Sequence, residues 1–256
     1  MLPTPIIPDD FKNLNKPTHL IKDPIVSLEK EMAYLKGFLK GKGFNQALKA
    51  LQFAKVCHKG QIRKTGEPYI MHPVRVCTML LSLGVDNDDI LAVALLHDVA
   101  EDCKVSMSDL TKMRFDTFII NGVDALTKKF GQTNEEYYSI LMSSNEAYVL
   151  LPKLCDRSHN VSTMAGAFSP EKIKKYIIET ETLVYELFEH AKKVIPEYSE
   201  QLFALRYQLE SLLKVYKLVV ESYVTVNLSD INISQPRTFG GNIELATTSF
   251  NTGMFN

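Results

Sequence analysis

The sequence of 256 residues has no tryptophan, few cysteines and no apolar run long enough to cross a bilayer. A membrane-spanning helix needs about 20 consecutive apolar residues. The first residues, MLPTPIIPDDFKNLNK, carry prolines and acidic side chains where a secretory signal needs an apolar stretch. We therefore expect a soluble, cytoplasmic protein with no membrane partner.

An excess of charge is also missing, because 29 Lys and Arg balance 30 Asp and Glu to give a formal net charge of −1. Without a basic surface the chain is not expected to bind nucleic acid, although local basic clusters can still hold a phosphorylated small molecule. No CxxC pair suggests a thiolate metal site. Buried free thiols in a reducing compartment are expected at the four cysteines: Cys57, Cys77, Cys103 and Cys155.

The chain divides by composition into three parts. Residues 1–24 hold five prolines and little periodicity, which predicts a non-helical N-terminal arm. Residues 25–221 have apolar side chains at helical spacing and predict one helical domain. Residues 222–256 are rich in Ser, Thr and Asn and predict a polar, non-helical tail, either a short hairpin or an unstructured end. The expected fold class is an all-α helical bundle.

Apolar periodicity and end signals place the individual helices. A third helix is expected to open at His72-Pro73, with His72 as its cap, and to end at Gly84. The run ILAVALLHDVAED predicts one continuous helix that is apolar nearly all round and therefore central to the core. The other expected helices cover residues 25–40, 44–58, 106–128, 134–159, 170–194 and 197–221.

That central run carries His97, Asp98, Glu101 and Asp102. At 100° per residue these four side chains fall within one arc of about 140°. Carboxylates crowded beside an apolar core repel each other, and a divalent cation removes the conflict. A solvated acidic face is the alternative, but the apolar residues on both flanks leave little of this helix for solvent.

Two other stretches offer further ligands. In KLCDRSHNVST, Asp156, Asn160 and Thr163 share one helix face, although a single Asp also commonly caps a helix or pairs with a neighbour, here Arg157. His72 follows a proline-containing turn, and alone it is more readily a structural cap. Two imidazoles and two carboxylates without a thiolate suit Mn²⁺, Fe²⁺, Ni²⁺ or Zn²⁺ better than Ca²⁺. The predicted ligands are His72, His97, Asp98 and Asp156.

A metal held in this way lowers the pKa of a bound water and polarises a phosphoryl oxygen. Glu101 and Asp102 lie one turn beyond the ligands and are placed for proton transfer. Arg63 and Lys64 form a pair of cations in the preceding loop, where they suit a polyphosphate substrate. A solvated basic loop is the alternative for that pair.

The spaced set H…HD…D resembles the HD superfamily of metal-dependent phosphohydrolases. Three strings resemble more closely the hydrolase domain of the RelA/SpoT family, which degrades the alarmone (p)ppGpp of the stringent response: HKGQIRKTGEPYIMHP, ALLHDVAED and KLCDRSHNVSTM. The resemblance covers roughly residues 44–190.

The resemblance implies an enzyme with one Mn²⁺ ion that hydrolyses the 3′-pyrophosphate of a guanosine polyphosphate, giving pyrophosphate and GDP or GTP. It gives the following positions their roles: His72, His97, Asp98 and Asp156 as metal ligands, Glu101 and Asp102 as catalytic acids and bases, Arg63 and Lys64 at the nucleotide, and Asn160 and Thr163 near the ribose and 3′-pyrophosphate.

The chain departs from the family at Ser162, where a basic residue is usual, and around His190, where a family segment is reduced. It has no room for the synthetase and regulatory domains of long members, so a small stand-alone alarmone hydrolase is expected. Two alternatives remain: a related phosphatase acting on another nucleotide, such as NADPH at its 2′-phosphate, and a catalytically silent nucleotide-sensing module. The sequence carries no signal for an oligomeric state.

Overall fold

The computed structural model describes the backbone of residues 24–231 and the side chains of residues 28–221. Every regular element of that range is a helix, and its extended backbone pairs only at an isolated bridge between Ile62 and Pro68. This confirms the all-helical fold class predicted from the sequence. The predicted arm, apart from Pro24, and the part of the predicted tail beyond Ile231 lie outside the described residues.

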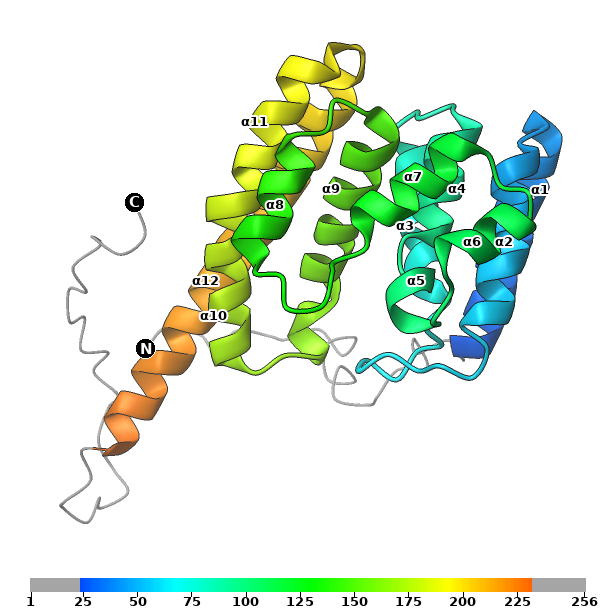
Figure 1. The fold of residues 1–256 in the computed structure, drawn as a ribbon. Coiled ribbons are helices and arrows are strands. Elements are labelled where there is room, and N and C mark those ends of the chain that lie inside the picture. Colours follow the sequence, from blue (N-terminus) through cyan, green and yellow to red (C-terminus); the bar gives the residue numbers. More distant parts are fainter. Residues whose placement is uncertain (1–23, 232–256) are drawn as a thin grey trace, which may run out of the picture. The chain divides into compact units, whose positions relative to one another are not determined.

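The helices follow one another along the chain with short connections (Figure 1). The first half contains α1 (Pro24–Lys42), α2 (Asn45–Cys57), α3 (Met71–Ser82), α4 (Asp88–Leu96), α5 (Val99–Asp102), α6 (Met107–Lys112) and α7 (Thr117–Leu126). The second half contains α8 (Asn134–Met142), α9 (Ala147–Thr163), α10 (Pro170–Glu179), α11 (Tyr185–Val194) and α12 (Ser199–Ile231). A 3₁₀ turn at Met164–Gly166 follows α9, a π-helical turn at Thr180–Val184 joins α10 to α11, and a 3₁₀ turn at Pro196–Tyr198 precedes α12.

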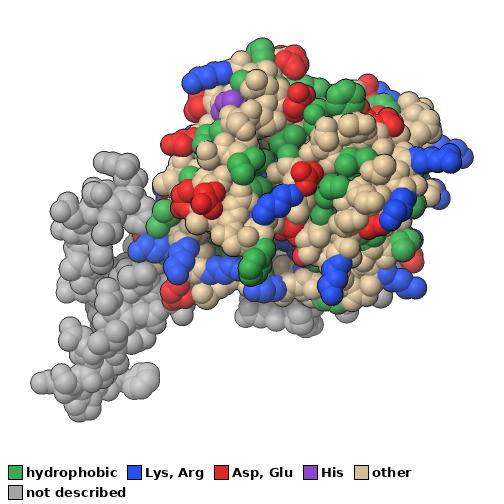
Figure 2. Space-filling view, in the orientation of Figure 1, with side chains coloured by type: hydrophobic (Ala, Val, Ile, Leu, Met, Phe, Trp, Pro, Cys, Tyr) green, Lys and Arg blue, Asp and Glu red, His purple; other side chains and the backbone are tan. Residues whose placement is uncertain are grey.

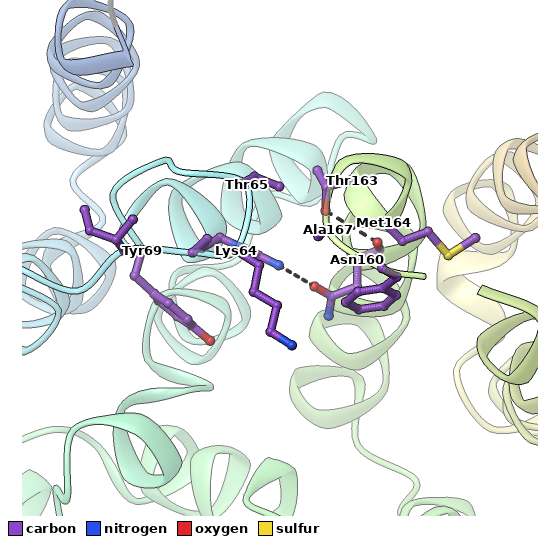
Figure 3. A pocket seen from close by; sticks show the side chains of 10 residues that line it. Lys64, Thr65, Tyr69, Asn160, Thr163, Met164 and Ala167 are labelled. Atoms are coloured by element: carbon purple, nitrogen blue, oxygen red, sulfur yellow. Dashed lines mark hydrogen bonds between the residues drawn. The ribbon is translucent and has the colours of Figure 1, made fainter. Parts of the chain in front are cut away.

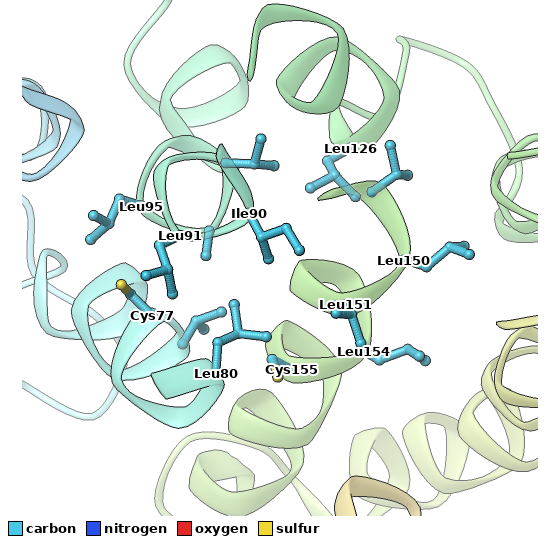
Figure 4. Packing of buried hydrophobic residues seen from close by; sticks show 14 of the residues in the cluster. Cys77, Leu80, Ile90, Leu91, Leu95, Leu126, Leu150, Leu151, Leu154 and Cys155 are labelled. Atoms are coloured by element: carbon cyan, nitrogen blue, oxygen red, sulfur yellow. The ribbon is translucent and has the colours of Figure 1, made fainter. Parts of the chain in front are cut away.

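Helix α4 is the centre of the core. All its residues from Ile90 to Leu96 are buried, and α2, α3, α7 and α9 pack around it. Figure 4 shows Leu80 of α3, Leu91 of α4 and Leu151 of α9 in one apolar cluster. This burial from all sides is the position that its nearly uniform apolar sequence predicts.

The four cysteines carry free thiols, as the sequence predicts. Cys77 and Cys155 lie in the same core cluster and are fully buried, and burial raises the pKa of both thiols. The predicted burial is wrong for Cys57 and Cys103, which are half-buried. The two core thiols therefore act as small apolar side chains that fill space beside α4.

The expected continuous helix over ILAVALLHDVAED is interrupted at its ionisable pair. Helix α4 ends at Leu96 and α5 begins at Val99, and Asp98 between them has φ −98° and ψ −6°, which are displaced from the angles of a regular α-helix. The expected helices over 106–128 and 134–159 are likewise divided, at residues 113–116 and 143–146. In the first of these turns Arg114 has a positive φ of 58°, which a helix cannot accommodate.

The chain separates into two compact units, residues 1–220 and residues 221–256. Composition predicts a non-helical tail from residue 222, whereas the backbone of α12 remains helical as far as Ile231. The reason is local: residues 222–231 contain neither glycine nor proline, so no stop signal follows the helix that starts at Ser199.

The surface of the first unit carries both signs of charge. On the face in Figure 2, Lys and Arg side chains are interspersed with Asp and Glu, in keeping with the formal net charge of −1. Among the described helices, none combines the length and the apolar character that a bilayer crossing requires.

Candidate metal centre

Four side chains from three separate stretches meet at one end of the core. His72 comes from α3, His97 and Asp98 from the turn between α4 and α5, and Asp156 from α9. The Nε2 atoms of the two imidazoles are 3.1 Å apart. His72 Nε2 lies 3.1 Å from Asp156 Oδ1 and 3.4 Å from Asp98 Oδ2. His97 Nε2 lies 3.2 Å from Asp98 Oδ2 and 3.7 Å from Asp156 Oδ1. Donor atoms of His72, His97 and Asp156 thus lie within 4.8 Å of one another, and Asp98 Oδ2 lies beside the two imidazoles.

Local structure explains why these donors converge. Asp102 N donates to Asp98 O at 2.9 Å, so the chain resumes a helix directly after the interruption at His97 and Asp98. Consecutive residues of a straight helix point about 100° apart, and the break removes that constraint. His72 lies within the first turn of α3 rather than at its cap, because Met71 N and His72 N already donate to Pro68 O and Tyr69 O and start the helix earlier.

The hydrogen bonds behind the imidazoles decide which nitrogens face the centre. His97 Nδ1 donates to the carbonyl of Ala94 at 2.7 Å, which leaves a lone pair on Nε2. His72 Nδ1 is 2.8 Å from His159 Nδ1. Burial would lower the pKa of His97, but Asp98 and Asp156 raise it well above its usual value when no metal is bound. In the neutral rings that metal binding requires, lone pairs of two Nε2 atoms and two carboxylates face one another in a mostly buried space. Such a set repels itself unless a cation lies between its members.

The distances between donors fit a transition-metal ion. Metal–donor bonds of about 2.1 Å place neighbouring donors of an octahedron or tetrahedron roughly 3 to 3.4 Å apart. Most of the separations here, 3.1 to 3.7 Å, lie in or close to that range. Mixed imidazole and carboxylate ligands without thiolate suit a divalent ion of the Mn²⁺ to Zn²⁺ series. The residues present therefore fit a bound divalent metal.

The charges of the pocket favour the same ion. Burial alone would raise the pKa of Asp156, but Lys153 and the two imidazoles hold that pKa well below its usual range. Burial would likewise raise the pKa of Asp98, and His97 and His72 keep it low. Both carboxylates are therefore ionised and available as ligands.

Neighbouring side chains hold the carboxylates in place. Tyr69 donates its hydroxyl to Asp98 Oδ2 at 2.8 Å. Asp156 accepts from Asn160 Nδ2 on Oδ1 at 2.6 Å and from Lys153 Nζ on Oδ2 at 3.1 Å. Partners of this kind orient metal ligands and fix their direction.

The acidic pair after the ligands is divided between two environments. Glu101 lines the metal pocket, a cavity of about 210 Å³, and accepts a hydrogen bond from Lys128 N at 2.5 Å. Burial raises the pKa of Glu101. Asp102 is exposed, as Glu101 is, but it lies outside the residues that line this cavity, and its backbone carbonyl accepts from Gln61 Nε2. The expected common arc therefore brings Glu101, but not Asp102, to the pocket wall.

A second cavity of about 220 Å³ adjoins the first. Figure 3 shows Lys64 and Tyr69 on one side of it and Asn160, Thr163 and Met164 on the other. Arg63, which also lines it, donates to Asn160 Oδ1 at 2.8 Å. Tyr69 and Asn160 line both cavities. The basic loop therefore faces α9 beside the metal centre.

A model of the HD domain matches residues 50–193, more than half of the chain. The chain belongs to the HD domain family.

Curated relatives resemble this HD domain over about half of the chain. A guanosine-3′,5′-bis(diphosphate) 3′-pyrophosphohydrolase of Aquifex aeolicus is 41% identical over 138 residues, which cover 52% of this chain and 19% of the relative. One from Haemophilus influenzae is 35% identical over 162 residues, covering 58% and 24%. The bifunctional (p)ppGpp synthase/hydrolase SpoT of Escherichia coli is 35% identical over 135 residues, covering 50% and 19%. The chain thus spans about a fifth of the length of these relatives, and the predicted relation to RelA/SpoT hydrolases is confirmed.

A solved structure shares the fold of this HD domain. It is described as a metazoan ortholog of SpoT that hydrolyzes ppGpp, and it aligns with a TM-score of 0.52 and 22% identity. The alignment covers 64% of this chain and 95% of the other. At this identity the likeness concerns the fold.

Residues of the HD domain that sequence reasoning missed are the supporting partners. Lys153 precedes Asp156 by three positions, so helical spacing alone places both on one face. Tyr69 and His159 lie inside the strings that carry the family resemblance, but their contacts to Asp98 and His72 cross 29 and 87 positions of sequence. Only the fold shows these two contacts.

The alternative pairing of Asp156 with Arg157 does not occur. Arg157 pairs with Glu179 and donates to the Tyr138 hydroxyl at 2.8 Å, and none of its hydrogen bonds within the described residues goes to Asp156. Its guanidinium also lies 4.0 Å from the ring centroid of Tyr176. These contacts occupy the guanidinium of Arg157, so the Asp156 carboxylate stays available as a candidate metal ligand.

The two positions where the chain departs from the family have local partners. Ser162 Oγ donates to the carbonyl of His159 at 2.8 Å. His190 Nε2 donates to the carbonyl of Ser144 at 2.7 Å, and His190 lines neither of the two cavities. Neither residue contributes a side chain to the metal pocket.

Proposed function

We propose that this HD domain is a Mn²⁺-dependent (p)ppGpp 3′-pyrophosphohydrolase that releases pyrophosphate and GDP or GTP. The observation that carries the proposal is the convergence of His72, His97, Asp98 and Asp156 beside a second cavity with a basic wall. The names of the relatives, most of them pyrophosphohydrolases of guanosine bis(diphosphate), support the substrate class. The free thiols suit a reducing compartment such as the cytoplasm.

The four converging side chains would hold the ion. When bound, Mn²⁺ lowers the pKa of a water molecule and polarises a phosphoryl oxygen. Tyr69, Lys153 and Asn160 keep the two carboxylates aimed at the centre through the hydrogen bonds described above. Preorganised ligands of this kind cost no rearrangement during the reaction.

Glu101 is the base that would accept the proton of the attacking water. Its carboxyl lines the same pocket as the ligands, and its raised pKa brings it closer to neutrality, where a general base works best. Asp102, outside the pocket wall, would act later in proton transfer through Tyr69, whose hydroxyl interacts with both Asp98 and Asp102.

The second cavity would bind the nucleoside part of the substrate. Arg63 and Lys64 supply cations for phosphate, and guanidinium groups bind phosphate oxygens with two parallel hydrogen bonds. Asn160 and Thr163 supply polar contacts at the border between the cavities, near the ribose and the 3′-pyrophosphate. Met164 and Phe168 add apolar wall that suits the face of a base.

The test is a turnover assay with the purified chain loaded with Mn²⁺, using ppGpp, pppGpp and NADPH as separate substrates. We expect pyrophosphate and GDP from ppGpp, with products separated by ion-exchange chromatography. Phosphate release from NADPH without pyrophosphate release from ppGpp overturns the proposal in favour of the related phosphatase. No turnover of any substrate supports the silent nucleotide-sensing module. Equal turnover by the wild type and Asp98→Ala overturns the proposed metal centre.

A further inference from the structure

Lys153 is a charged side chain of the metal pocket. The proposed function gives it only the role of holding the Asp156 carboxylate in place. It lies on α9, one turn before Asp156, and its side chain is 17% exposed. Among the described residues that line this pocket, it is the single Lys or Arg. A buried cation in a pocket for an anionic substrate is a candidate for direct contact with that substrate.

The two oxygens of Asp156 have different partners. Oδ1 faces His72 Nε2 at 3.1 Å, whereas Oδ2 accepts from Lys153 Nζ at 3.1 Å. Lys153 Nζ also lies 5.1 Å from the ring centroid of Tyr137. An ammonium has three N–H donors, and Asp156 and Tyr137 between them engage at most two. At least one donor remains for a ligand in the pocket.

Lys153 lies beside anionic side chains inside the fold. Its ammonium pairs with Asp156 Oδ2 at 3.1 Å, and it lines the same cavity as Glu101. The cation therefore shares the pocket with a predicted ligand and with the proposed base.

Lys153 changes the net charge of the metal pocket. Asp98, Asp156 and Glu101 bring three negative charges to the pocket, and a divalent ion balances two of them. With the ammonium the pocket is neutral before substrate enters. Without it a pyrophosphate group, itself multiply anionic, would enter a pocket of net negative charge.

We propose that Lys153 is a catalytic residue that binds a non-bridging oxygen of the 3′-pyrophosphate, an inference that rests on the proposed function. In the step, the oxygen of a water bonds to the phosphorus attached to the ribose O3′, and the bond from that phosphorus to O3′ breaks. Glu101 takes one proton of the water, and this proton is returned to O3′ as the P–O3′ bond breaks, so that O3′ leaves as a hydroxyl. Lys153 stabilises the charge on the phosphoryl oxygens during this transfer and holds the pyrophosphate product.

The experiment compares Lys153→Met, Lys153→Arg and the wild type, with Lys192→Met as a control that removes an exposed cation paired with Glu189. Three quantities are measured: kcat and KM for ppGpp, the affinity of the metal-free protein for Mn²⁺, and the affinity of the Mn²⁺-loaded protein for inorganic pyrophosphate. Calorimetric titration gives both affinities. Lys153→Gln replaces Lys153→Met if the Met variant fails to fold.

We expect Lys153→Met to lower kcat/KM by about 10²-fold, the usual effect of losing one charge-stabilising donor. Its affinity for pyrophosphate, measured at saturating Mn²⁺, should fall at least tenfold, and Lys153→Arg should recover part of it. Its affinity for Mn²⁺ should fall less than its affinity for pyrophosphate, because Asp156 keeps the hydrogen bond from Asn160. Lys192→Met should match the wild type in all three measurements.

A loss of Mn²⁺ affinity that accounts for the loss of turnover, with unchanged pyrophosphate binding, overturns the inference and leaves Lys153 as a positioning residue for Asp156. Pyrophosphate binding does not require turnover, so the two proposals can fail separately. If the wild type leaves ppGpp intact but binds pyrophosphate through Lys153, the proposed function fails and the contact stands.

Discussion

His72 and His159 meet through their Nδ1 atoms at 2.8 Å, so one ring must donate the proton and the other must accept it. A metal bound at His72 Nε2 requires the proton to be on His72 Nδ1. His159 then accepts as a neutral ring. Burial, together with the nearby His72, lowers the pKa of His159 to about 3, so it is neutral at ordinary pH. His159 therefore fixes the tautomer and the direction of His72.

This relationship predicts different effects for two substitutions of His159. Asparagine can place its Oδ1 near the position of Nδ1 and accept the same hydrogen bond, whereas leucine cannot. We expect His159→Leu to weaken Mn²⁺ binding by about 10- to 100-fold and His159→Asn to weaken it less. Calorimetric titration of both variants with Mn²⁺ measures this, and equal affinities for the two would show that His159 has no such role.

Asp98→Asn tests the ligand role of Asp98 through the stability that Mn²⁺ adds. The amide oxygen can still accept from Tyr69, but the negative charge that His97 and His72 stabilise is lost. We expect its melting temperature in EDTA to lie below that of the wild type. Mn²⁺ at 100 times its Kd should stabilise the wild type by about 2.7 kcal/mol and the variant much less. An equal Mn²⁺ shift in both proteins contradicts the ligand role.

The central helix and the convergence of the candidate ligands could be predicted because both rest on local patterns. Apolar residues all round α4 indicate burial, and two imidazoles with two carboxylates in apolar surroundings indicate a cation. The break at Asp98 could not be predicted from periodicity, since Val99 and Ala100 continue the apolar pattern of a helix. Helical propensity is a weak signal, and packing against other elements overrides it.

The residues that hydrogen-bond to the candidate ligands and to Asn160 could not be predicted from sequence patterns, for a different reason. The contact of Tyr69 with Asp98 and that of Arg63 with Asn160 depend on how a loop between α2 and α3 lies over other helices. Neither pair has a fixed spacing that a motif could record. The assignment of Asp102 to proton transfer comes from its position one turn beyond the ligands and from the resemblance, and it stays a prediction.

We expect replacement of Glu101 to raise the stability of the metal-free protein at pH 7 and to lower turnover. Folding raises the pKa of the Glu101 carboxyl, so its anion is less stable in the folded protein than in the unfolded chain. The anion therefore destabilises the fold at pH values above the unfolded pKa of about 4.5. This destabilisation disappears when the pH falls below that value. We expect Glu101→Gln, without metal, to melt at or slightly above the wild type at pH 7 and to match it near pH 4. Its turnover at pH 7 should fall by about 10²- to 10⁴-fold. A Gln variant with full activity removes Glu101 as the base.

Gly122 predicts a test of core packing that does not involve the metal. A Cβ atom at this position in α7 would lie 2.6 Å from Val93 Cγ2 of α4, whereas one at Gly37 in α1 would meet nothing within 4 Å. We expect Gly122→Ala to lower the free energy of unfolding by about 1 to 3 kcal/mol through overpacking. Gly37→Ala should raise it by about 0.5 to 1 kcal/mol, since alanine favours the helix. Urea titrations compare the two, and a neutral Gly122→Ala would mean that α4 and α7 can move apart at little cost.

The side-chain amide of Asn160 engages both cavities at once, with its oxygen bonded to Arg63 and its nitrogen to Asp156. An amide is planar and stiff. A molecule that draws Arg63 towards itself therefore also turns the Asn160 amide and shifts the Asp156 carboxylate hydrogen-bonded to it. Under the proposed function, binding of the nucleoside and hydrolysis of the phosphate are coupled through Asn160. A nucleoside that fits the second cavity poorly should be bound less tightly and also hydrolysed more slowly.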